Sequence, residues 1–506
     1  MSGLDCDVLI VGAGPTGISL ALIAAQYGAS VIICEKEADV YPLPRAAHID
    51  HEVMRIFQSV GAAEEIAATS RTTSHYDFLT ADGEILLRFD GSDQIGPGGW
   101  PGANMIHQPS LERALRKRLP DTDRIELRTL WTFVGYEETG ESVSAKFETP
   151  EGSRTVTAQF LAGTDGTRSP VRAAAGIELD DLQFDEPWLV IDTIVQDFER
   201  LPKVNLQICD PARPTTCVLM GEGRHRWEFM MLPGETPEQV LDDAFIAGLL
   251  EPWKVDGAVI LERKAVYRFN ARVAKSWKKG RVLLAGDAAH QTPPFAGQGL
   301  CAGARDAANL GWKLGMVASG KAPEETLDTY QIEREPHARA TIEMAMMMGR
   351  TVCITDPAAA AERDRQMLAA RAAGQSPDGR TNYPEIISGL IFEGGSGAGT
   401  YFPQFVSADG RTRLDDVLGA GAWLIGNCGS SDFPDLKTVN LKSEKLGSAK
   451  SDIQRWLARH HVEAVLIRPD RYVFGTGSPV ALAEAWQNLL ASKPAPKLQK
   501  ASSRGP

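Results

Sequence analysis

The chain has 506 residues, of which 43% are hydrophobic, so it is long enough to bury more than one core and to form roughly two to four domains. A net charge of -13 argues against a nucleic-acid partner, because proteins that bind phosphate backbones usually present clustered Lys and Arg side chains. The seven scattered cysteines, with no signal peptide and no apolar run of about twenty residues, predict a cytoplasmic protein without a membrane span.

The first elements predicted along the chain are a strand, a glycine-rich turn, a helix and a second strand, within residues 7–35. In the turn, Gly12, Gly14 and Gly17 form a GxGxxG motif directly after the apolar run DVLIV. Glycines at these positions let the backbone approach a pyrophosphate, and the positive end of the helix faces its charge. Glu35 ends the second strand, where a carboxylate can accept hydrogen bonds from an adenosine ribose. This context predicts a dinucleotide-binding unit.

Short strands replace this pattern after residue 76, where alternating runs are interrupted by Asp-Gly turns that are typical of hairpins. A helix is predicted from about residue 107, and strand character then dominates from about residue 181 to 268. The chain is therefore expected to cross between two domains more than once.

A second motif follows the apolar strand at residues 281–285. Asp287 comes just beyond this strand, and Gly297, Gln298 and Gly299 follow a Pro-Pro turn at the start of a long helix. A carboxylate at a strand end can hold a ribityl hydroxyl, and a helix N-terminus can stabilise negative charge on the pyrimidine edge of a reduced flavin. The glycine turn alone is compatible with NAD or FAD, and this second motif favours FAD.

Three motifs in chain order carry a resemblance to a known family: GAGPTG at residues 12–17, DGTRSPVR at residues 165–172 and AGDAAHQTPPFAGQG at residues 285–299. The sequence resembles the class A flavoprotein monooxygenases, which are FAD-dependent aromatic hydroxylases. Within them it is most similar to the 3-(3-hydroxyphenyl)propionate hydroxylase and phenol hydroxylase branch, through the segments YPLPRAAHIDHEVMR, RWEFMMLPGE, VYRFNARVA and VLIRPDRYVFG. The resemblance covers nearly the whole chain.

The element pattern and the resemblance predict an α/β fold with a Rossmann-like FAD-binding domain, an inserted β-sheet substrate domain and a small thioredoxin-like C-terminal domain. The expected boundaries are residues 1–75, 100–180 and 265–350 for the discontinuous FAD-binding domain, 76–99 and 181–264 for the substrate-binding sheet, 351–400 for a connector, 401–492 for the thioredoxin-like domain and 493–506 for a tail. The thioredoxin-like domain has Cys428 but no CxxC pair, so we expect a packing or homodimer role for it and no redox catalysis.

By the resemblance, FAD is the cofactor, and NADH or NADPH and O2 are co-substrates. The positions that match the family's cofactor-binding motifs are Gly12, Gly14, Pro15, Thr16, Gly17, Glu35, Lys36, Arg45, Gln108, Asp165, Asp287, Pro294, Gly297, Gln298 and Gly299. Outside this motif context, Arg45 would be interpreted as an ordinary ion-pair residue and Asp165 as the cap of an Asp-Gly turn.

The reaction that the resemblance implies is hydroxylation of a phenolic small molecule through a flavin hydroperoxide, after hydride transfer from NAD(P)H to FAD. A phenol becomes electron-rich enough to react when it loses its proton, so the site needs a base or proton relay and must exclude water. His48, Asp50 and His51 are the candidates for the relay, and Pro293 is grouped with them because it would border the isoalloxazine ring. The alternative for Asp50 or His51 is a helix cap.

Substrate walls are expected from the inserted sheet. In RWEFMML, strand alternation places Trp227 and Phe229 on one face and Arg226 on the other, and either face could line the pocket. Tyr267 and Arg268 are further candidate neighbours of the substrate. If the substrate carries a carboxylate, as a 3-hydroxyphenylpropanoate-like acid does, Arg226 or Arg268 is the candidate partner, because a guanidinium fits both carboxylate oxygens.

Two other kinds of function are compatible with these motifs. A tailoring, ring-cleaving or antibiotic-inactivating oxygenase of the same fold would carry the same FAD motifs, because they serve the cofactor and not the substrate. A non-catalytic module that retains FAD is the second alternative, and the intact AGDAAHQTPPFAGQG segment argues against it. Oxygen consumption with and without phenols distinguishes an enzyme from such a module.

Overall fold

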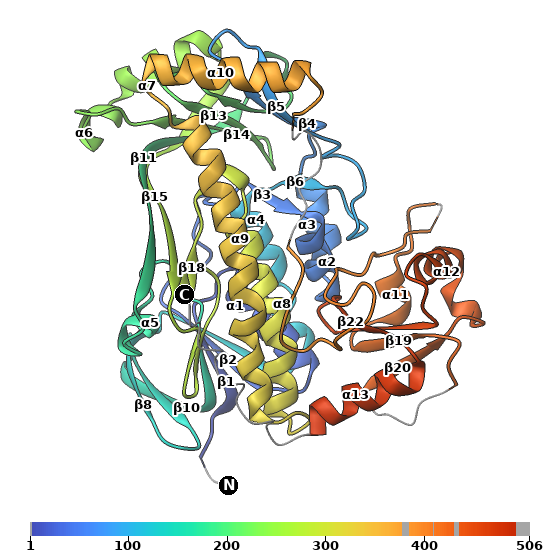
Figure 1. Ribbon diagram of the computed structural model, residues 1–506. Helices are drawn as coiled ribbons and strands as arrows, with labels where there is room; N and C mark the ends of the chain where they lie inside the picture. The colour runs from blue at the N-terminus through green and yellow to red at the C-terminus, as the bar shows by residue number, and fades with distance from the viewer. Residues whose placement is uncertain (1–2, 377–383, 408, 430–434, 492–506) are drawn as a thin grey trace, which may run out of the picture.

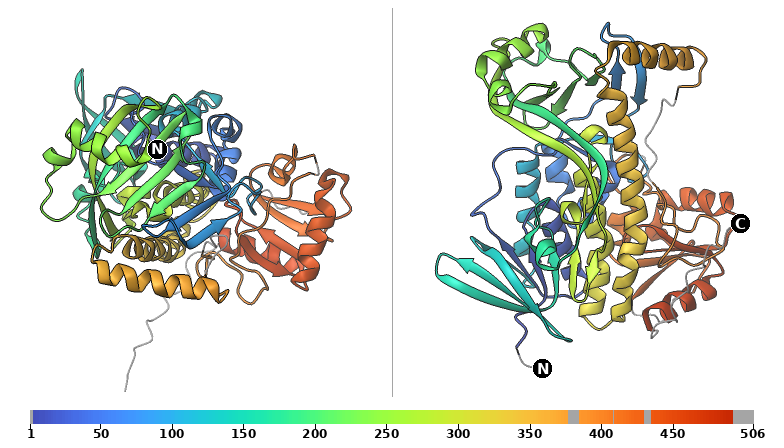
Figure 2. Two further views of the ribbon diagram at one scale, coloured as in Figure 1. Left: turned by 90° about the horizontal axis from the view of Figure 1, so that it is seen from above. Right: turned by 60° about the vertical axis from the view of Figure 1, so that its left-hand side comes forward.

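The computed structural model describes residues 3–376, 384–407, 409–429 and 435–491, and the tail predicted at residues 493–506 lies outside them. Figures 1 and 2 show two regions built on separate β-sheets and a smaller domain beside them, formed by the C-terminal part of the chain. The fold is α/β, with a Rossmann-like unit, an inserted sheet domain and a thioredoxin-like C-terminal domain, which confirms the predicted fold class.

The first sheet is parallel at its centre and has the strand order β16-β17-β10-β1-β2-β7, with β9 and β8 added antiparallel beside β10. Val8, Leu9 and Ile10 of β1 are wholly buried, as expected for a parallel strand that is covered on both faces. The strands are β1 (Cys6–Val11), β2 (Val31–Glu35), β7 (Ile125–Thr129), β8 (Thr132–Glu138), β9 (Val143–Thr149), β10 (Gly152–Gly163), β16 (Lys278–Lys279) and β17 (Val282–Leu284).

Helix α8 (Gly299–Ala318) packs closely against α1 (Pro15–Gln26) over this sheet (Figure 1). A Cβ atom on Gly311 would lie 2.7 Å from Cγ2 of Ile23, which is closer than real Cβ atoms approach their neighbours. A Cβ atom on Gly303 would collide with the hydroxyl of Thr16 near the start of α1. The glycines of α8 therefore bring the N-terminal ends of the two helices to the same side of the sheet.

The second sheet has the strand order β18-β15-β11-β14-β13-β12-β4-β5. Its two longest strands, β11 and β15, pair antiparallel along nearly their full length and join the two regions of the molecule (Figures 1 and 2). The boundary predicted between residues 264 and 265 falls inside β15. The strands are β4 (His75–Leu79), β5 (Ile85–Asp90), β11 (Leu179–Val195), β12 (Asn205–Ile208), β13 (Thr215–Met220), β14 (Arg224–Met230), β15 (Val259–Ala274) and β18 (His290–Gln291).

The remaining helices cover the two sheets and the space between them. In Figure 1, the long helix α9 (Thr329–Val352) runs beside α8, and α10 (Pro357–Ala372), which lies in the predicted connector, crosses above β4 and β5. Strands β3 (His48–Asp50) and β6 (Ala103–Met105) form a short antiparallel pair. The other helices here are α2 (His51–Ser59), α3 (Ala63–Thr69), α4 (Gln108–Arg116), α5 (Pro170–Ala174), α6 (Pro237–Val240) and α7 (Asp243–Leu250).

The C-terminal domain contains a sheet of order β20-β19-β21-β22, in which β19 is parallel to β20 and antiparallel to β21. A buried ion pair connects it to the rest of the chain: Asp415 accepts hydrogen bonds from Arg55 of α2, and also from Arg471 of its own domain. Its elements are α11 (Leu414–Leu418), β19 (Ala422–Gly426), β20 (Leu436–Asn440), α12 (Ala449–Arg459), β21 (Ala464–Ile467), β22 (Val473–Gly477) and α13 (Pro479–Ala491).

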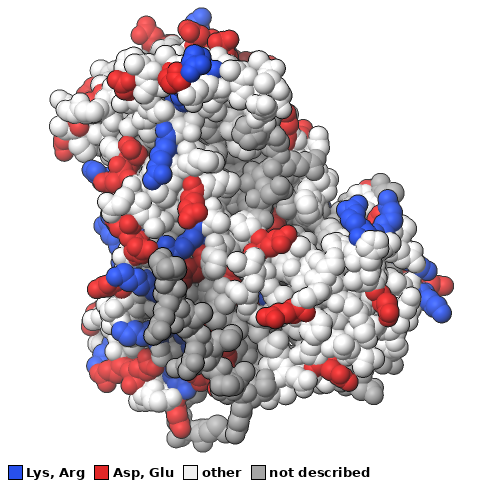
Figure 3. All heavy atoms as spheres, viewed as in Figure 1, with Lys and Arg blue, Asp and Glu red and all other residues white. Residues whose placement is uncertain are grey.

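The surface carries charges of both signs. Figure 3 shows acidic and basic side chains interspersed on the visible face. Among the helices that the structure describes, none has both the length and the apolar character required to cross a bilayer.

Candidate functional site

A cavity of about 1820 Å³ lies between the first sheet and the second. On one side it is lined by the glycine turn before α1, the end of β2, residues 41–48, the start of α4 and residues 287–300. On the other side it is lined by residues of β4, β5, β11, β13, β14 and β15. Pockets for one drug-sized ligand are typically about 300–1,000 Å³, so this cavity has room for a large cofactor and a second small molecule.

The three glycines of the first turn differ in what surrounds them. Gly12 has φ +105, and a Cβ atom there would lie 2.6 Å from the carbonyl oxygen of Thr164. A Cβ atom on Gly17 would collide with the carbonyl oxygen of Gly12, so Gly17 serves close packing of the helix on the strand. No atom of the described residues lies within 4 Å of the corresponding position on Gly14, which lines the cavity. Gly14 thus leaves space for a ligand at the N-terminal end of α1, beside Pro15 and Thr16.

Glu35 lines the cavity at the end of β2 and is held by two backbone groups. Its Oε2 atom accepts a hydrogen bond of 2.8 Å from the Ala13 amide, and Oε1 accepts one of 3.0 Å from the Glu37 amide. Lys36 follows at the rim, with an exposed side chain. This geometry suits a carboxylate that accepts further hydrogen bonds from ribose hydroxyls.

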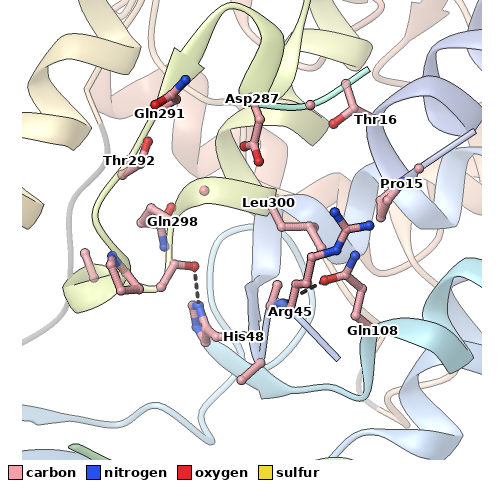
Figure 4. Close-up of a pocket in the computed structure, with 18 of the residues that line it drawn as sticks. Pro15, Thr16, Arg45, His48, Gln108, Asp287, Gln291, Thr292, Gln298 and Leu300 are labelled. Carbon is pink, nitrogen blue, oxygen red and sulfur yellow. Dashed lines mark hydrogen bonds between the residues drawn. The ribbon is translucent and has the colours of Figure 1, made fainter. Parts of the chain in front are cut away.

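Arg45 and Gln108 lie next to each other in the cavity wall, as Figure 4 shows. Gln108 accepts a hydrogen bond of 2.7 Å from the Ala46 amide, which ties the residue 41–48 segment to α4. The guanidinium of Arg45 lies over the ring of Tyr41, 5.2 Å from its centre. A long cationic side chain and an amide are therefore available beside the glycine turn, where a pyrophosphate would lie.

Two carboxylates reach the same cavity from strand ends. Asp165 accepts a hydrogen bond of 2.9 Å from the Val171 amide through Oδ2, while its Oδ1 is buried without a partner among the described residues. Figure 4 shows the Asp287 carboxylate pointing into the cavity. Burial raises the pKa of both carboxyl groups. Each has an oxygen that a ligand hydroxyl could satisfy.

His48 and the segment before α8 face each other across a short distance. The Nδ1 atom of His48 lies 3.2 Å from the carbonyl oxygen of Gly297, the contact dashed in Figure 4. Gly297 has φ +62, and a Cβ atom there would lie 3.0 Å from His48 Nδ1, so glycine is needed at this position. Pro294, Gln298 and Gly299 line the cavity beside it, at the N-terminal end of α8.

The second sheet contributes polar, aliphatic and aromatic side chains to the cavity. Strand alternation directs Arg226 and Glu228 of β14 into it, and Thr216 and Val218 of the neighbouring β13 have the same orientation. Sequence reasoning missed most of this wall and the part of α9 beside it. Besides Glu228, the missed lining residues include Tyr76, Phe89, Val190, Asn205, Thr216, Val218, Val266 and Phe269 of the sheet and Met344 and Met348 of α9.

Comparison with known proteins identifies the family. Residues 5–345 match the sequence pattern of a family described as FAD binding domain, and residues 431–492 match the HcaD C-terminal domain. The chain is 38% identical to a probable NADH-specific resorcinol 4-hydroxylase of Rhodococcus jostii (strain RHA1), over 96% of this chain and 95% of the relative. It is 33% identical to a 3-(3-hydroxy-phenyl)propionate/3-hydroxycinnamic acid hydroxylase of Burkholderia cenocepacia (strain HI2424), over 92% and 93%. The chain belongs to the FAD-dependent aromatic hydroxylases.

Solved structures agree with this family fold. A complex of aklavinone-11 hydroxylase with FAD and aklavinone has a TM-score of 0.79 at 22% identity, and covers 97% of this chain and 100% of that one. The OxyS anhydrotetracycline hydroxylase from Streptomyces rimosus has a TM-score of 0.74 at 25% identity, with the same coverage. FAD is thus the cofactor of this hydroxylase, NAD(P)H its reductant and O2 its oxidant.

The cavity residues fit FAD. The open position at Gly14, the unpartnered Oδ1 of Asp165 and the cavity-facing carboxylate of Asp287 are the features that a dinucleotide with ribityl and ribose hydroxyls would use. When bound, FAD supplies hydride acceptance and oxygen activation, which no side chain can provide. The polypeptide supplies binding, orientation and proton transfer.

Two of the predicted catalytic residues do not line the cavity and are held within the surrounding structure. Asp50 caps α2 by accepting hydrogen bonds from two backbone amides, and it forms a buried ion pair of 2.8 Å with Arg305. Burial opposes ionisation of Asp50, but Arg305, the two neighbouring histidines and the Val53 amide together outweigh it and hold the pKa below its usual range. Asp50 does not line the cavity, so the helix-cap alternative describes it. Pro293 is buried before the turn at residues 294–296 and also lies outside the lining, whereas Pro294 is part of it.

His51 has features of both a site residue and a structural residue. It lines the cavity, but its Nδ1 accepts a hydrogen bond of 3.1 Å from the Gly98 amide. A Cβ atom on Gly96 or Gly98 would collide with this imidazole or its backbone, so the two glycines pack directly on it. His51 therefore holds the loop at residues 96–98 in place, and His48 is the predicted relay residue with the better placement.

The predicted aromatic wall faces away from the cavity. Trp227 and Phe229 are buried in a separate core with residues of α7, and they do not line the cavity. Arg226 does line it, but its guanidinium donates to both oxygens of Asp192 and to the carbonyls of Pro44 and Arg45. It therefore fixes the cofactor-side loop against the sheet.

The two remaining substrate candidates lie on β15 at the cavity edge. Arg268 pairs with Asp185 at 2.8 Å, and its side chain is largely exposed. Tyr267 lines the cavity and has the guanidinium of Arg263 5.0 Å from its ring centre. Each cationic side chain predicted to receive a substrate carboxylate thus already has an acidic partner.

Proposed function

We propose that this hydroxylase acts on a single-ring phenol and uses NADH as its reductant. The two relatives at 38% and 33% identity, which align with more than nine-tenths of the chain, are named for single-ring phenols. The more similar of these two is named as NADH-specific. The solved structures with polycyclic compounds in their names are 22–25% identical and support the fold alone.

The observation in the structure that carries the phenolic part of the proposal is His48, which lines the cavity beside the turn before α8. A carbonyl oxygen can only accept, so in the contact with Gly297 the Nδ1 atom of His48 donates. Burial lowers the pKa of His48, which keeps the ring neutral at pH 7 and leaves Nε2 unprotonated. An unprotonated Nε2 can take the proton of a phenol hydroxyl and make the ring electron-rich.

The apolar walls would protect this step from water. Phe269, Phe295, Met344 and Met348 line the cavity on the side of β15 and α9. Phe295 packs edge-on against Phe269 at 5.9 Å between ring centres, so this wall is continuous. A dry wall beside the reacting ring limits wasteful loss of activated oxygen to water.

The test is oxidation of NADH and of NADPH by the purified yellow protein with a panel of phenols, with hydroxylated product and hydrogen peroxide quantified together. We expect resorcinol or a related single-ring phenol to stimulate NADH oxidation with matching product. Stimulation by polycyclic phenols alone would contradict the proposal. If no phenol stimulates a flavin-loaded protein, the family assignment stands and the proposed substrate class fails.

A further inference from the structure

Glu228 places a carboxyl group in the substrate side of the cavity, and no residue in the part of the chain that the structure describes donates a hydrogen bond to it. It lies on the central strand β14, opposite Val190 of β11 and Thr216 of β13, and all three residues line the cavity. The side chain of Glu228 is only 10% exposed. Since this residue comes from the second sheet, it is separate from the glycine turn and the strand ends that make up the cofactor cradle.

The nearest cation is already engaged. Arg226 lies two residues before Glu228 on the same face of the strand, and Nη1 of Arg226 is 3.6 Å from Oε1 of Glu228. That separation is an ion-pair distance but too long for a hydrogen bond. Nη1 donates instead to the Arg45 carbonyl at 2.7 Å, and Nε and Nη2 of Arg226 donate to Asp192 at 2.6 and 3.1 Å. No side chain in the described ranges donates a hydrogen bond to Glu228.

A buried carboxyl group without donors is costly, and the cost is removed when a ligand supplies the donor. Neighbouring polar groups do not take this role. Tyr76 and Thr216 both donate to Oε1 of Gln207, so their hydroxyl protons are committed there. Burial raises the pKa of Glu228, which is consistent with a group that has lost water and gained no donor.

We infer that Glu228 is the specificity-determining residue of the substrate pocket and accepts a hydrogen bond from a second hydroxyl group on the substrate ring. This inference rests on the proposed function and narrows it to uncharged dihydroxybenzenes. A substrate carboxylate offers Glu228 no hydrogen-bond donor and would itself bring a negative charge into a buried, low-dielectric wall, which disfavours its binding. Glu228 therefore selects for polyhydroxylated rings and against phenolic acids.

The experiment measures ligand binding from the change in flavin absorbance, so that it does not depend on turnover. The FAD-loaded wild type, Glu228→Gln and Glu228→Ala are titrated with resorcinol, with phenol, which lacks the second hydroxyl, and with 3-(3-hydroxyphenyl)propanoate. In the wild type we expect resorcinol to bind about tenfold to a hundredfold more tightly than phenol, the range for hydrogen bonds to charged groups. In Glu228→Ala this ratio should fall towards one, and the acid should bind more tightly than it does to the wild type.

Glu228→Gln keeps the shape of the side chain and a neutral acceptor. A change in its affinities is therefore not explained by misfolding. It should bind the acid better than the wild type while it keeps part of the preference for resorcinol over phenol. The matched control is Glu262→Gln, on the same sheet, where Glu262 pairs with Arg224 and does not line the cavity. The control should leave all three affinities unchanged.

The inference is overturned if both Glu228 variants retain FAD and show the wild-type order and ratios of affinity. It is also overturned if the wild type binds the phenolic acid as tightly as resorcinol. Failure of the proposed function would give a different result. In that case no phenol would perturb the flavin or stimulate NADH oxidation in the wild type itself.

Discussion

The Nδ1 atom of His48 lies 3.2 Å from the carbonyl oxygen of Gly297, which connects β3 to the turn before α8. Because the carbonyl can only accept, this contact fixes the tautomer in which Nδ1 carries the proton. Gly297 adopts φ +62, a conformation that a residue with a side chain rarely adopts. The position and the basicity of the proposed proton acceptor thus depend on the backbone of the AGDAAHQTPPFAGQG segment.

Replacement of His48 by Asn should reduce hydroxylation by roughly a hundredfold to ten-thousandfold, the usual contribution of a general base. Asn can still donate to the Gly297 carbonyl, so the fold and the FAD content should be retained. Product formation and FAD content are measured on the same preparation. A variant with full flavin and wild-type product formation would show that another group takes the phenol proton.

The pH dependence of kcat/KM for the phenol should report the same histidine. Burial lowers the pKa of His48 from its ordinary value of 6.5, so the neutral form predominates at pH 6.5 and above. We therefore expect kcat/KM to stay level from about pH 6.5 upward until the phenol itself titrates, and to fall only at more acidic pH, where His48 gains a proton. His48→Asn should lack this acid limb. An acid limb centred above pH 6.5 would contradict the assignment.

The cofactor cradle could be predicted from the sequence because its signals are local. Gly12, Gly14, Gly17 and Glu35 lie within one βαβ unit; the packing of the turn requires Gly12 and Gly17, and Glu35 accepts a hydrogen bond from the turn at the strand end. Asp287 is recognisable in the same way, since it follows a buried strand directly. The geometry of a turn or a strand end depends mainly on residues that are close in the sequence, so these positions can be recognised without knowledge of the fold.

The substrate side could not be predicted in the same way. Strand alternation correctly places Trp227 and Arg226 on opposite faces of the strand. Which face meets the cavity depends on long-range packing: α7 packs on the Trp227 face, and residues 41–48 lie against Arg226. Asp50 resembled a relay residue until the fold brought Arg305, 255 positions away, against it. Glu228 gave no local signal, because its burial depends on neighbours from several separate strands.

Gly14→Val should abolish FAD binding and leave the polypeptide folded. The backbone at Gly14 is extended, with φ -75, and nothing in the described part of the chain lies within 4 Å of the added Cβ, so the side chain would fill only the space proposed for the pyrophosphate. The contrasting variant is Gly17→Ala, whose Cβ would collide with the Gly12 carbonyl and should lower soluble yield as well. Flavin absorbance and circular dichroism separate the two outcomes. Full flavin occupancy in Gly14→Val would exclude this turn as the pyrophosphate site.

Glu333→Gln should destabilise the contact between α9 and the C-terminal domain. The Oε2 atom of Glu333 accepts hydrogen bonds from Lys313 and Arg468 at 2.8 and 2.6 Å, and all three side chains are fully buried. Removal of one partner from a buried ion pair leaves uncompensated charge and costs roughly 3–5 kcal/mol. We expect a clear fall in the thermal unfolding temperature of the full chain. The matched control is Glu335→Gln on the same helix, where the partly exposed pair with Arg339 is worth about 0–1 kcal/mol.

The same carboxylate predicts how stability depends on pH. Burial opposes ionisation of Glu333, but Arg468 and Lys313 outweigh it and lower its pKa from 4.5 to about 2 in the folded protein. The unfolded chain therefore binds the proton more readily, so the contribution of Glu333 is fully present above pH 4.5 and is lost as the pH falls from 4.5 towards 2. In Glu333→Gln this contribution is absent, so the difference in unfolding temperature from the wild type should be largest near neutral pH and shrink below pH 4.5. A difference that stays constant across this interval would show that Glu333 acts through packing and not through its charge.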